Sequence, residues 1–450
     1  MKLLNFFLNK PKAMITLMII ILLANLIVGK IKWQYYSFYG VIITLISLLI
    51  LRKLGWLNLN DNKAKWIIGI NIVFLLLPLV LNWAFPTEEI PTPSGEYNIG
   101  TKIYELKDDS RNEIYGSNQS KKRKIKYQVF YPADDVHGYK KDKWMSDGKP
   151  LSRYLAKNMN ILPFMLDHTL EIESNSYLNA AVSSKEDSFP IVIISHGWKG
   201  FRELHVDYAE ELASNGIIAV TIDHTYGSRV VKFSDDSVVY YDKEALPRFT
   251  LPEEFDKLGS ILATTFSEDI NAVMADLENI NREDDNLKDK INLDNLGLLG
   301  HSTGGGGSVY TTLNNGKSIK AIMGLDAWVE PYREKDLDDG LKMPSLFLRS
   351  EQWKEGPNNG SLTTLLENST NTNLVQLYDT KHVDFSMSYM YSPLTKYIGL
   401  TGSLENRQSS KIQREYILAF FEKYLNNDES ISDNFVNEIA DKYQAAEVVK

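Results

Sequence analysis

The hydrophobic pattern divides this chain of 450 residues into two parts of different character. The first 85 residues contain three long apolar stretches, at 13–29, 35–51 and 66–85, that are almost without charged side chains. The remainder has shorter apolar runs between polar segments, which is typical of a globular domain. Because a helix needs about 20 residues to cross the hydrocarbon layer of a membrane, the pattern predicts an N-terminal bundle of about three transmembrane helices.

The three stretches do not fit this interpretation equally well. The third reaches spanning length in spite of Pro78, which membrane helices tolerate. The first two are near the lower limit, so a shallow hairpin remains open. Aromatic residues lie at the expected borders, at Trp33, Tyr35, Tyr36, Trp66 and Trp83. A cleaved signal peptide is the alternative for the first stretch, but no small-x-small cleavage site follows it. Three nearly charge-free segments in a row disfavour buried helices of a soluble domain.

Basic residues predict how the anchor is oriented. Three lysines lie before the first stretch, two lie between the first and second, and four Lys or Arg lie between the second and third. Glu88 and Glu89 follow the third stretch. The positive-inside rule then places the N-terminus in the cytoplasm and residues 86 onward outside. We therefore expect a multi-pass protein of the cell membrane with an extracellular catalytic domain.

Charge and composition exclude several functions for the second part. Of the 49 basic and 58 acidic residues, 40 and 57 lie after residue 85, which gives this part a net charge of −17. Nucleic acid is therefore not an expected partner, since it requires a basic face. The chain has no cysteine, which excludes disulfides, zinc–thiolate sites and a cysteine nucleophile. The abundance of Asn, Lys and Ile suggests a bacterial genome rich in A and T.

The second part alternates apolar, β-branched runs with amphipathic segments. We expect strands at 124–132, 191–194, 217–222, 295–299, 319–325, 345–349 and 374–378, and helices at 208–215, 251–280 and 412–425. Such alternation predicts a doubly wound, mostly parallel sheet. Ligands bind at the carboxyl ends of the strands in such sheets.

The same pattern predicts the domain boundaries. Residues 1–85 form the anchor, and 86–101 form a linker, rich in proline, that holds the catalytic unit off the membrane. The catalytic domain covers 102–425, and 426–450 form a C-terminal tail. Within it, the polar segment 133–189 is an insertion that either shapes a substrate mouth or covers the sheet.

One strand leads into a motif that carries chemistry. Gly300-His301-Ser302-Thr303-Gly304 follows the strand at 295–299, and a helix is expected after it. Gly-x-Ser-x-Gly between a strand and a helix is the pattern of a nucleophile elbow, which predicts the α/β-hydrolase fold with Ser302 as nucleophile. A glycine-rich turn that happens to contain serine is the alternative. Gly306 and Gly307 are costly at a helix start, which suggests close packing there.

A serine hydroxyl needs a base, and the base needs an orienting carboxylate. His382 is the one histidine after Ser302, and it follows the last expected strand. Asp326 ends the strand at 319–325, so we predict it to be the acid. Asp379, Asp384 and Glu351 are competitors, and Asp384 lies too close to His382 in the chain to reach its far side easily. We expect His301 to serve packing.

The tetrahedral intermediate of ester cleavage needs two backbone N–H donors. Thr303, directly after the nucleophile, should supply one. The loop His196-Gly197-Trp198 follows the strand at 191–194, so the amide of Trp198 is predicted to supply the other. A plain strand-to-helix turn is the alternative for this loop.

Several motifs together give a resemblance to a known family. Ile194-Ser-His-Gly-Trp198, Leu212-Ala-Ser-Asn-Gly216, Asp223-His224, the elbow itself, Gly324-Leu-Asp-Ala-Trp328 and His382-Val-Asp-Phe385 resemble the platelet-activating factor acetylhydrolase family of the secreted phospholipase A2 type, over about residues 122–425. The resemblance implies the triad Ser302, Asp326 and His382, an oxyanion hole at Trp198 and Thr303, and hydrolysis of short or oxidised acyl esters without calcium.

The sequence departs from the family pattern in two places beside the pocket. Thr303 stands where the animal enzymes carry Phe, and Trp198 where they carry Leu, so the acyl preference remains open. The anchor is not part of the animal enzymes, so their lipoprotein partners are not transferred.

We therefore expect a membrane-anchored serine ester hydrolase that acts on short-chain acyl esters of lipids, with no metal and no cofactor. A general esterase, a polyester hydrolase or a dienelactone-type hydrolase is one alternative. A catalytically silent binding domain on a membrane anchor is another. The oligomeric state stays open.

Overall fold

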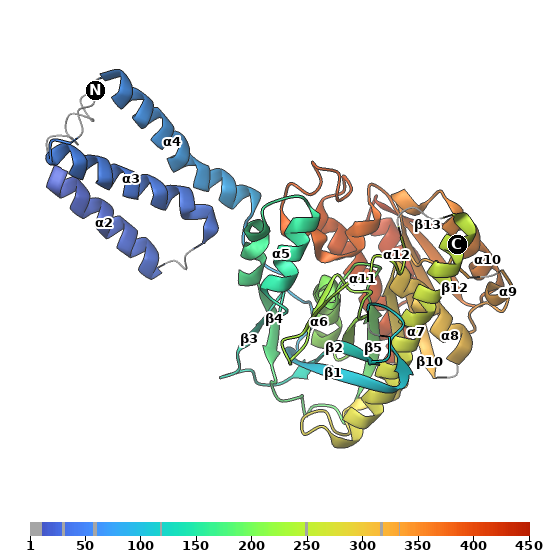
Figure 1. Ribbon diagram of the computed structural model, residues 1–450. Helices are drawn as coiled ribbons and strands as arrows, with labels where there is room; N and C mark the ends of the chain where they lie inside the picture. The colour runs from blue at the N-terminus through green and yellow to red at the C-terminus, as the bar shows by residue number, and fades with distance from the viewer. Residues whose placement is uncertain are drawn as a thin grey trace.

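The structure is a computed structural model that describes residues 11–28, 32–56, 61–117, 119–247, 251–315, 318–332 and 334–450. Its N-terminal part contains the helices α2 (Pro11–Val28), α3 (Tyr36–Lys53) and α4 (Asp61–Ala84), with the 3-10 turn η1 (Trp33–Tyr35) before α3. These helices project from one side of a larger α/β body, and α4 leads into it (Figure 1).

The predicted bundle of three spans is supported for one helix only. Among the described residues, Trp33–Leu51 is long and apolar enough to cross a membrane, by length and composition. The other apolar helical stretches, Ile15–Ala24 and Gly69–Ala84, are shorter. At about 1.5 Å per residue they fall short of the roughly 30 Å that a spanning helix must cover. Residue 29 and three of the lysines used to predict the orientation, Lys2, Lys10 and Lys30, lie outside the described residues.

The segment after α4 lies against the α/β body. At its start, Ser392 Oγ of the body donates to the carbonyl of Ala84, the last residue of α4, at 2.5 Å, while the carbonyl of Phe85 accepts from Gln34 Nε2 of η1 at 2.9 Å. Further along, side chains of the body bind the segment at Glu88, Pro91 and Thr92, through Arg407, Asn175 and Arg414. In this structure the predicted linker is thus a packed connection and does not hold the catalytic domain away from α4.

The body is built on one sheet of eleven strands. In chain order its strands are β1 (Asn98–Asn112), β2 (Lys122–Ala133), β3 (Lys141–Lys143), β4 (Glu173–Leu178), β5 (Phe189–Ser195), β6 (Ile218–Asp223), β9 (Ile291–His301), β10 (Ile319–Leu325), β11 (Ser345–Ser350), β12 (Thr372–Leu377) and β13 (Ala446–Val448). Their order across the sheet is 13-12-11-10-9-5-6-2-1-4-3. The central pairs from β6 through β12 are parallel, while β2 pairs antiparallel with both β1 and β6. A separate hairpin joins β7 (Val230–Lys232) and β8 (Val238–Tyr240).

Helices cover both faces of this sheet. They are α5 (Lys149–Asn158), α6 (Val206–Ser214), α7 (Pro252–Glu283), α8 (Thr303–Asn315), α9 (Glu334–Leu337), α10 (Pro357–Asn368), α11 (Asn406–Leu425) and α12 (Phe435–Lys442), with 3-10 segments η2 (Pro163–Glu171), η3 (Arg202–His205), η4 (Glu351–Trp353), η5 (His382–Phe385) and η6 (Met387–Tyr391). Side chains of α6, α11 and α12 join one core cluster, and those of α7, α8 and α10 join the other. The predicted mostly parallel α/β architecture is confirmed.

The period of two along β5 assigns its residues to the two faces. Val192 and Ile194 belong to the cluster with α6 and α11, whereas Ile191 and Ile193 belong to the cluster with α7 and α8. Because all four are buried, the strand reads as a continuous apolar run.

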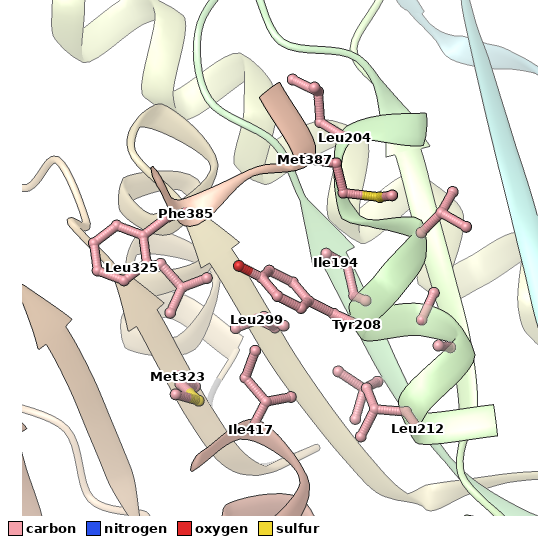
Figure 2. Close-up of a cluster of buried hydrophobic side chains, with 14 of the residues drawn as sticks. Ile194, Leu204, Tyr208, Leu212, Leu299, Met323, Leu325, Phe385, Met387 and Ile417 are labelled. Atoms are coloured by element: carbon pink, nitrogen blue, oxygen red, sulfur yellow. The ribbon is translucent and has the colours of Figure 1, made fainter. Parts of the chain in front are cut away.

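The loop that carries His382 is anchored in one of these cores. Phe385 and Met387, just after His382, are fully buried among side chains that include Leu325 and Tyr208, as Figure 2 shows. Burying side chains of this size stabilises the loop by roughly 1.5–3 kcal/mol each. The position of His382 is therefore tied to the core beneath it.

Both ends of the predicted catalytic domain extend further than expected. Strand β1 begins at Asn98 and runs to Asn112, where the mixture of charged and apolar residues gave no clear strand pattern. Beyond 425, α12 packs on the body and β13 pairs antiparallel with β12, with Val448 opposite Val375. Residues 426–450 therefore complete the sheet edge in the structure.

We expect stability to depend on pH through Glu210, which is fully buried on α6. Burial raises the pKa of its carboxyl to about 7, against roughly 4.3 in an unfolded chain. The folded state therefore holds a proton that the unfolded state releases, so this group opposes folding increasingly as pH rises from about 4 to 7. Between pH 5 and 8 the free energy of unfolding should therefore fall by about 3 kcal/mol less in Glu210→Gln than in the wild type, as measured by urea unfolding. The exposed Glu278→Gln on α7 is the control, and identical pH profiles for Glu210→Gln and wild type would contradict the expectation.

Candidate active site

Ser302 lies in a tight turn between β9 and α8. Its φ is +54°, in the left-handed region that non-glycine residues seldom occupy. Neighbouring backbone holds it there: Ser302 N donates to Leu325 O at 3.0 Å, and Ser302 O accepts from Trp328 N at 2.9 Å. A residue in this region costs about 1–3 kcal/mol, which these bonds to the end of β10 help to offset.

The glycines around Ser302 allow backbone segments to approach closely. A Cβ on Gly304 would lie 2.3 Å from Ser195 O, and one on Gly300 would lie 2.4 Å from Gly304 O. At Gly306 a Cβ would lie 2.2 Å from Trp328 O, and at Gly307 one would lie 2.9 Å from Phe266 Cβ. The close packing suggested for Gly306 and Gly307 is thus present.

His382 and Asp326 come together from two different strand ends. His382 Nδ1 lies 3.0 Å from Asp326 Oδ2. Because the carboxylate accepts, Nδ1 carries the proton and Nε2 keeps its lone pair. Asp326 also accepts from Ser350 N at 2.8 Å and Ser350 Oγ at 2.5 Å, and it is almost fully buried. The carboxylate is therefore fixed in place on the side of the imidazole that faces Nδ1.

Further contacts orient the His382 ring and were not predicted. Trp353 stacks on it with ring centroids 4.2 Å apart and planes 3° apart. The backbone N of His382 donates to Gln352 Oε1 at 2.9 Å. Neither Trp353 nor Gln352 was predicted, because their segment η4 carries no motif or periodic pattern that indicates a site.

His301 supports the same loop. Its Nε2 donates to His382 O at 3.0 Å, and the two rings lie 4.5 Å apart. Burial, followed by the nearby His382, holds the pKa of His301 well below its usual range, so the ring stays neutral. The packing role expected for His301 is present, with a hydrogen bond added to it.

The competing acids are engaged elsewhere. Asp384 Oδ2 accepts from Lys381 N at 2.7 Å and from Gly402 N at 2.8 Å. Asp379 accepts from Ser403 Oγ, and Glu351 accepts from the backbone N of Asp379. Among the described residues, only Asp326 hydrogen-bonds the His382 ring.

The loop after β5 lies directly against the elbow. A Cβ on Gly197 would lie 2.7 Å from Ser302 Cβ and 3.2 Å from its Oγ. The next amide, of Trp198, donates to no acceptor within the described part of the chain. Thr303 begins α8, and the first amides of a helix have no partner inside it. Thr303 directly follows Ser302, and Trp198 follows the glycine that packs on the Ser302 side chain, so both amides are candidate donors near this serine.

Ser302, His382 and Trp198 line one cavity of about 290 Å³. Leu155, Asn158 and Met159 of the 133–189 insertion line it as well, so this insertion shapes the mouth. The Ser302 hydroxyl makes no hydrogen bond to a described residue. Such bonds are commonly long in unliganded sites and tighten when substrate is bound. Among the described residues, no group of three or more His, Asp or Glu side chains is placed to hold a metal ion.

Comparison with known proteins places the chain in a family. The family model described as "Platelet-activating factor acetylhydrolase, isoform II" matches residues 83–244 and 262–442, more than half of the chain. The chain belongs to this acetylhydrolase family.

Animal members of the acetylhydrolase family are distant relatives. Identity to the platelet-activating factor acetylhydrolase of Cavia porcellus is 23% over 265 residues, 54% of this chain and 59% of that protein. The Gallus gallus protein is 24% identical, with 55% and 64% covered, and the Bos taurus protein is 23% identical, with 75% and 77% covered. A solved ferulic acid esterase from Streptomyces cinnamoneus matches with a TM-score of 0.62 and 18% identity, over 81% of this chain and all of its own. The last likeness shows the fold alone.

A second Ser–His–Asp series lies in the interior of the body. Ser195 Oγ is 2.7 Å from His224 Nε2, and His224 Nδ1 is 3.0 Å from Asp269 Oδ2. All three side chains are fully buried, and Arg123 binds the same aspartate at 2.6 Å. Ser195 directly precedes the loop with Gly197 and Trp198, so this series supports that loop from below.

We expect Gly306→Ala to lower the free energy of unfolding by about 1–3 kcal/mol, because the new methyl would overlap Trp328 O and force the backbone apart. The matched control is Gly360→Ala in the exposed part of α10, where nothing lies within 4 Å of an added Cβ. That change should stabilise the helix by up to about 1 kcal/mol. Urea unfolding of both variants checks this, and a neutral effect of Gly306→Ala would refute close packing at the elbow.

Proposed function

We propose that the chain is a serine ester hydrolase in which Ser302 is the nucleophile, His382 the general base and Asp326 the residue that orients it. The observation that carries the proposal is the bond from His382 Nδ1 to Asp326, which leaves Nε2 able to accept a proton in the cavity that Ser302 lines. Membership of an acetylhydrolase family and the likeness of fold to an esterase support ester hydrolysis.

The chemistry follows from these groups. Ser302 Oγ attacks the ester carbonyl carbon while its proton passes to His382 Nε2. The tetrahedral intermediate collapses, the C–O bond to the alcohol breaks, and His382 returns the proton to the departing alcohol. Water then attacks the acyl-serine by the same route, releases the acid and restores Ser302. Asp326 stays ionised and stabilises the imidazolium that forms twice in the cycle.

The amides of Trp198 and Thr303 are the proposed oxyanion hole. The Trp198 amide donates to no acceptor among the described residues. The Thr303 amide stands at the start of α8 and has no partner within that helix. Donors that are already aimed at the developing oxyanion stabilise the transition state without reorganisation. Removing one such donor typically costs about 100- to 1,000-fold in kcat.

The cavity supports a small acyl group. Its volume of about 290 Å³ lies at the lower end of ligand pockets, which run from about 300 to 1,000 Å³. We therefore propose short-chain acyl esters of lipids as substrates, in line with the acetylhydrolase name of the relatives. The helical stretch Trp33–Leu51 is the proposed membrane anchor, which would keep the site close to such esters.

A fluorophosphonate probe should label Ser302, because a hydroxyl with a basic partner in an open cavity reacts with it. Peptide mapping by mass spectrometry should place the adduct on the peptide that contains Ser302 and not on the one that contains the buried Ser195. Ser302→Ala should abolish both the adduct and hydrolysis of p-nitrophenyl acetate. Full activity in Ser302→Ala, or an adduct on Ser195, would remove Ser302 from the mechanism.

Asp326→Asn should lower kcat by about 1,000-fold or more while KM changes little, because the amide no longer stabilises the imidazolium and favours the wrong tautomer. The matched control is Asp384→Asn. Asp384 lies on the loop that carries His382, but its carboxylate accepts from backbone amides and not from the His382 ring. Steady-state kinetics on p-nitrophenyl acetate decides this. An equal loss of kcat in both variants would mean that Asp326 acts through the structure of the loop and not by orienting the His382 ring.

The substrate class is tested by chain length and by head group. Activity on p-nitrophenyl esters should fall steeply beyond about four acyl carbons, because the cavity is small. A short-chain phospholipid should also be cleaved. Activity on the p-nitrophenyl series with none on the phospholipid would favour a general esterase.

A further inference from the structure

The cavity beside Ser302 is lined by positive charge although the domain around it is acidic. Lys199 and Arg229 are among its lining residues, and no carboxylate of the described chain is. Residues after 85 carry a net charge of −17, so a cavity wall with two cations and no acid runs against the composition. A local excess of positive charge is the ordinary way to attract an anion.

Arg229 is held in place by backbone and leaves most of its guanidinium available. Its backbone N donates to Gly200 O at 2.8 Å, and its Nε donates to Lys199 O at 3.0 Å. Lys199 N in turn donates to Gly227 O at 2.9 Å, which fastens this turn to the loop of the proposed oxyanion hole. Within the described residues, Arg229 Nη1 and Nη2 bind no acceptor.

Two fully buried arginines are paired with carboxylates, whereas Arg229 is half-buried. Arg123 binds Asp269 and Glu113 at 2.6 and 2.9 Å, and Arg202 binds Asp147 at 2.8 Å. A guanidinium removed from water normally needs such a partner, because the desolvation of an unpaired charge is costly. Arg229 lines the cavity, is half-buried and has no carboxylate partner among the described residues, so it is open to an anion that enters the cavity.

Aromatic side chains surround the two cations. Tyr391 lines the cavity with Arg229, and Lys199 lies 5.6 Å from the ring centre of Trp198 and 5.0 Å from that of Tyr241. Burial lowers the pKa of Arg229, but a guanidinium keeps its proton at any pH at which the protein is folded. Its two Nη atoms match the paired oxygens of a phosphate or a carboxylate.

We propose that Arg229, with Lys199 beside it, binds an anionic oxygen group of the ester substrate, a phosphate or a carboxylate, while Ser302 attacks the ester bond. The inference rests on the proposed function and narrows its substrate class to esters that carry a negative charge within reach of the reacting carbonyl. Arg229 is then a specificity residue that contacts the substrate away from the bond that breaks.

Two pairs of esters test the proposal and separate the two sources of the anion. Dibutyroyl phosphatidic acid is compared with dibutyroylglycerol, and mono-p-nitrophenyl glutarate with p-nitrophenyl pentanoate. The wild type should prefer the charged member of at least one pair. Arg229→Met should lower the ratio of kcat/KM, charged over neutral, by about 10- to 100-fold, mainly through KM, since a hydrogen bond to a charged group is lost. Arg229→Lys should fall between the two.

Which pair responds identifies the anion. A change confined to the phosphate pair assigns a lipid head group, and a change confined to the glutarate pair assigns a charge on the acyl side. Arg282→Met, which removes an exposed arginine at the end of α7, is the control and should leave both ratios unchanged. A wild type without preference in either pair, or a preference that persists in Arg229→Met, would overturn the proposal.

A binding measurement separates this inference from the proposed hydrolysis. Calorimetry with glycerol 3-phosphate and with glutarate is performed on Ser302→Ala and on Ser302→Ala combined with Arg229→Met. Weaker binding of either anion by at least tenfold in the double variant supports the anion site even if the wild type cleaves none of the esters. Equal binding of both anions by the two variants refutes it, and equal thermal stability of the two shows that the fold is intact.

Discussion

The site depends on how closely three pieces of backbone approach one another around Ser302. The start of α8 lies against the carbonyls of Ser195 and of Trp328, at distances that only Gly304 and Gly306 permit. This contact places the elbow between the end of β5 and the end of β10. The loop that contains Trp198 follows β5, and Asp326 follows β10. The left-handed conformation of Ser302 persists because the surrounding hydrogen bonds fix it on both sides.

The groups around the elbow are held before any substrate arrives. Asp326 receives two hydrogen bonds from Ser350, and the His382 ring contacts the rings of both Trp353 and His301. The loop that carries His382 is fastened to the core by Phe385. Preorganised groups of this kind do not need to reorder during a reaction, which is where much of the rate enhancement of enzymes originates.

The sequence predicted the parts of the molecule whose signals are local. Buried parallel strands read as apolar, β-branched runs, so the strand at 319–325 was placed to the residue, and Ser302, Asp326 and His382 follow from what stands at strand ends. Their proximity is seen in the structure, while their catalytic roles remain proposals. Trp353, Ser350 and Arg229 were missed because their importance comes from contacts between distant segments, which leave no periodicity in the chain.

The errors at the two ends have a similar origin. Apolar runs suggested three spans, but among the described residues only one helix is both long and apolar enough to cross a membrane. Prolines at 86–95 predicted a linker that holds the catalytic unit off the membrane, yet hydrogen bonds from α11 fix this segment against the body. The pairing of β13 with β12 was not predicted, because a strand of three residues is too short to show alternation.

The buried series of Ser195, His224 and Asp269 bears on how hydrolases are recognised. Its hydroxyl–imidazole bond is formed at 2.7 Å, whereas the Ser302 hydroxyl has no bond to a described residue. A template search that ranks serine, histidine and aspartate by hydrogen-bond geometry would therefore select the interior set first. What separates the two sets is the backbone around each serine: Ser195 ends a regular strand inside the body, and Ser302 stands on a strained turn at a cavity. Screening of uncharacterised proteins for such triads gains specificity when the φ angle and solvent access of the serine are scored together with the distances.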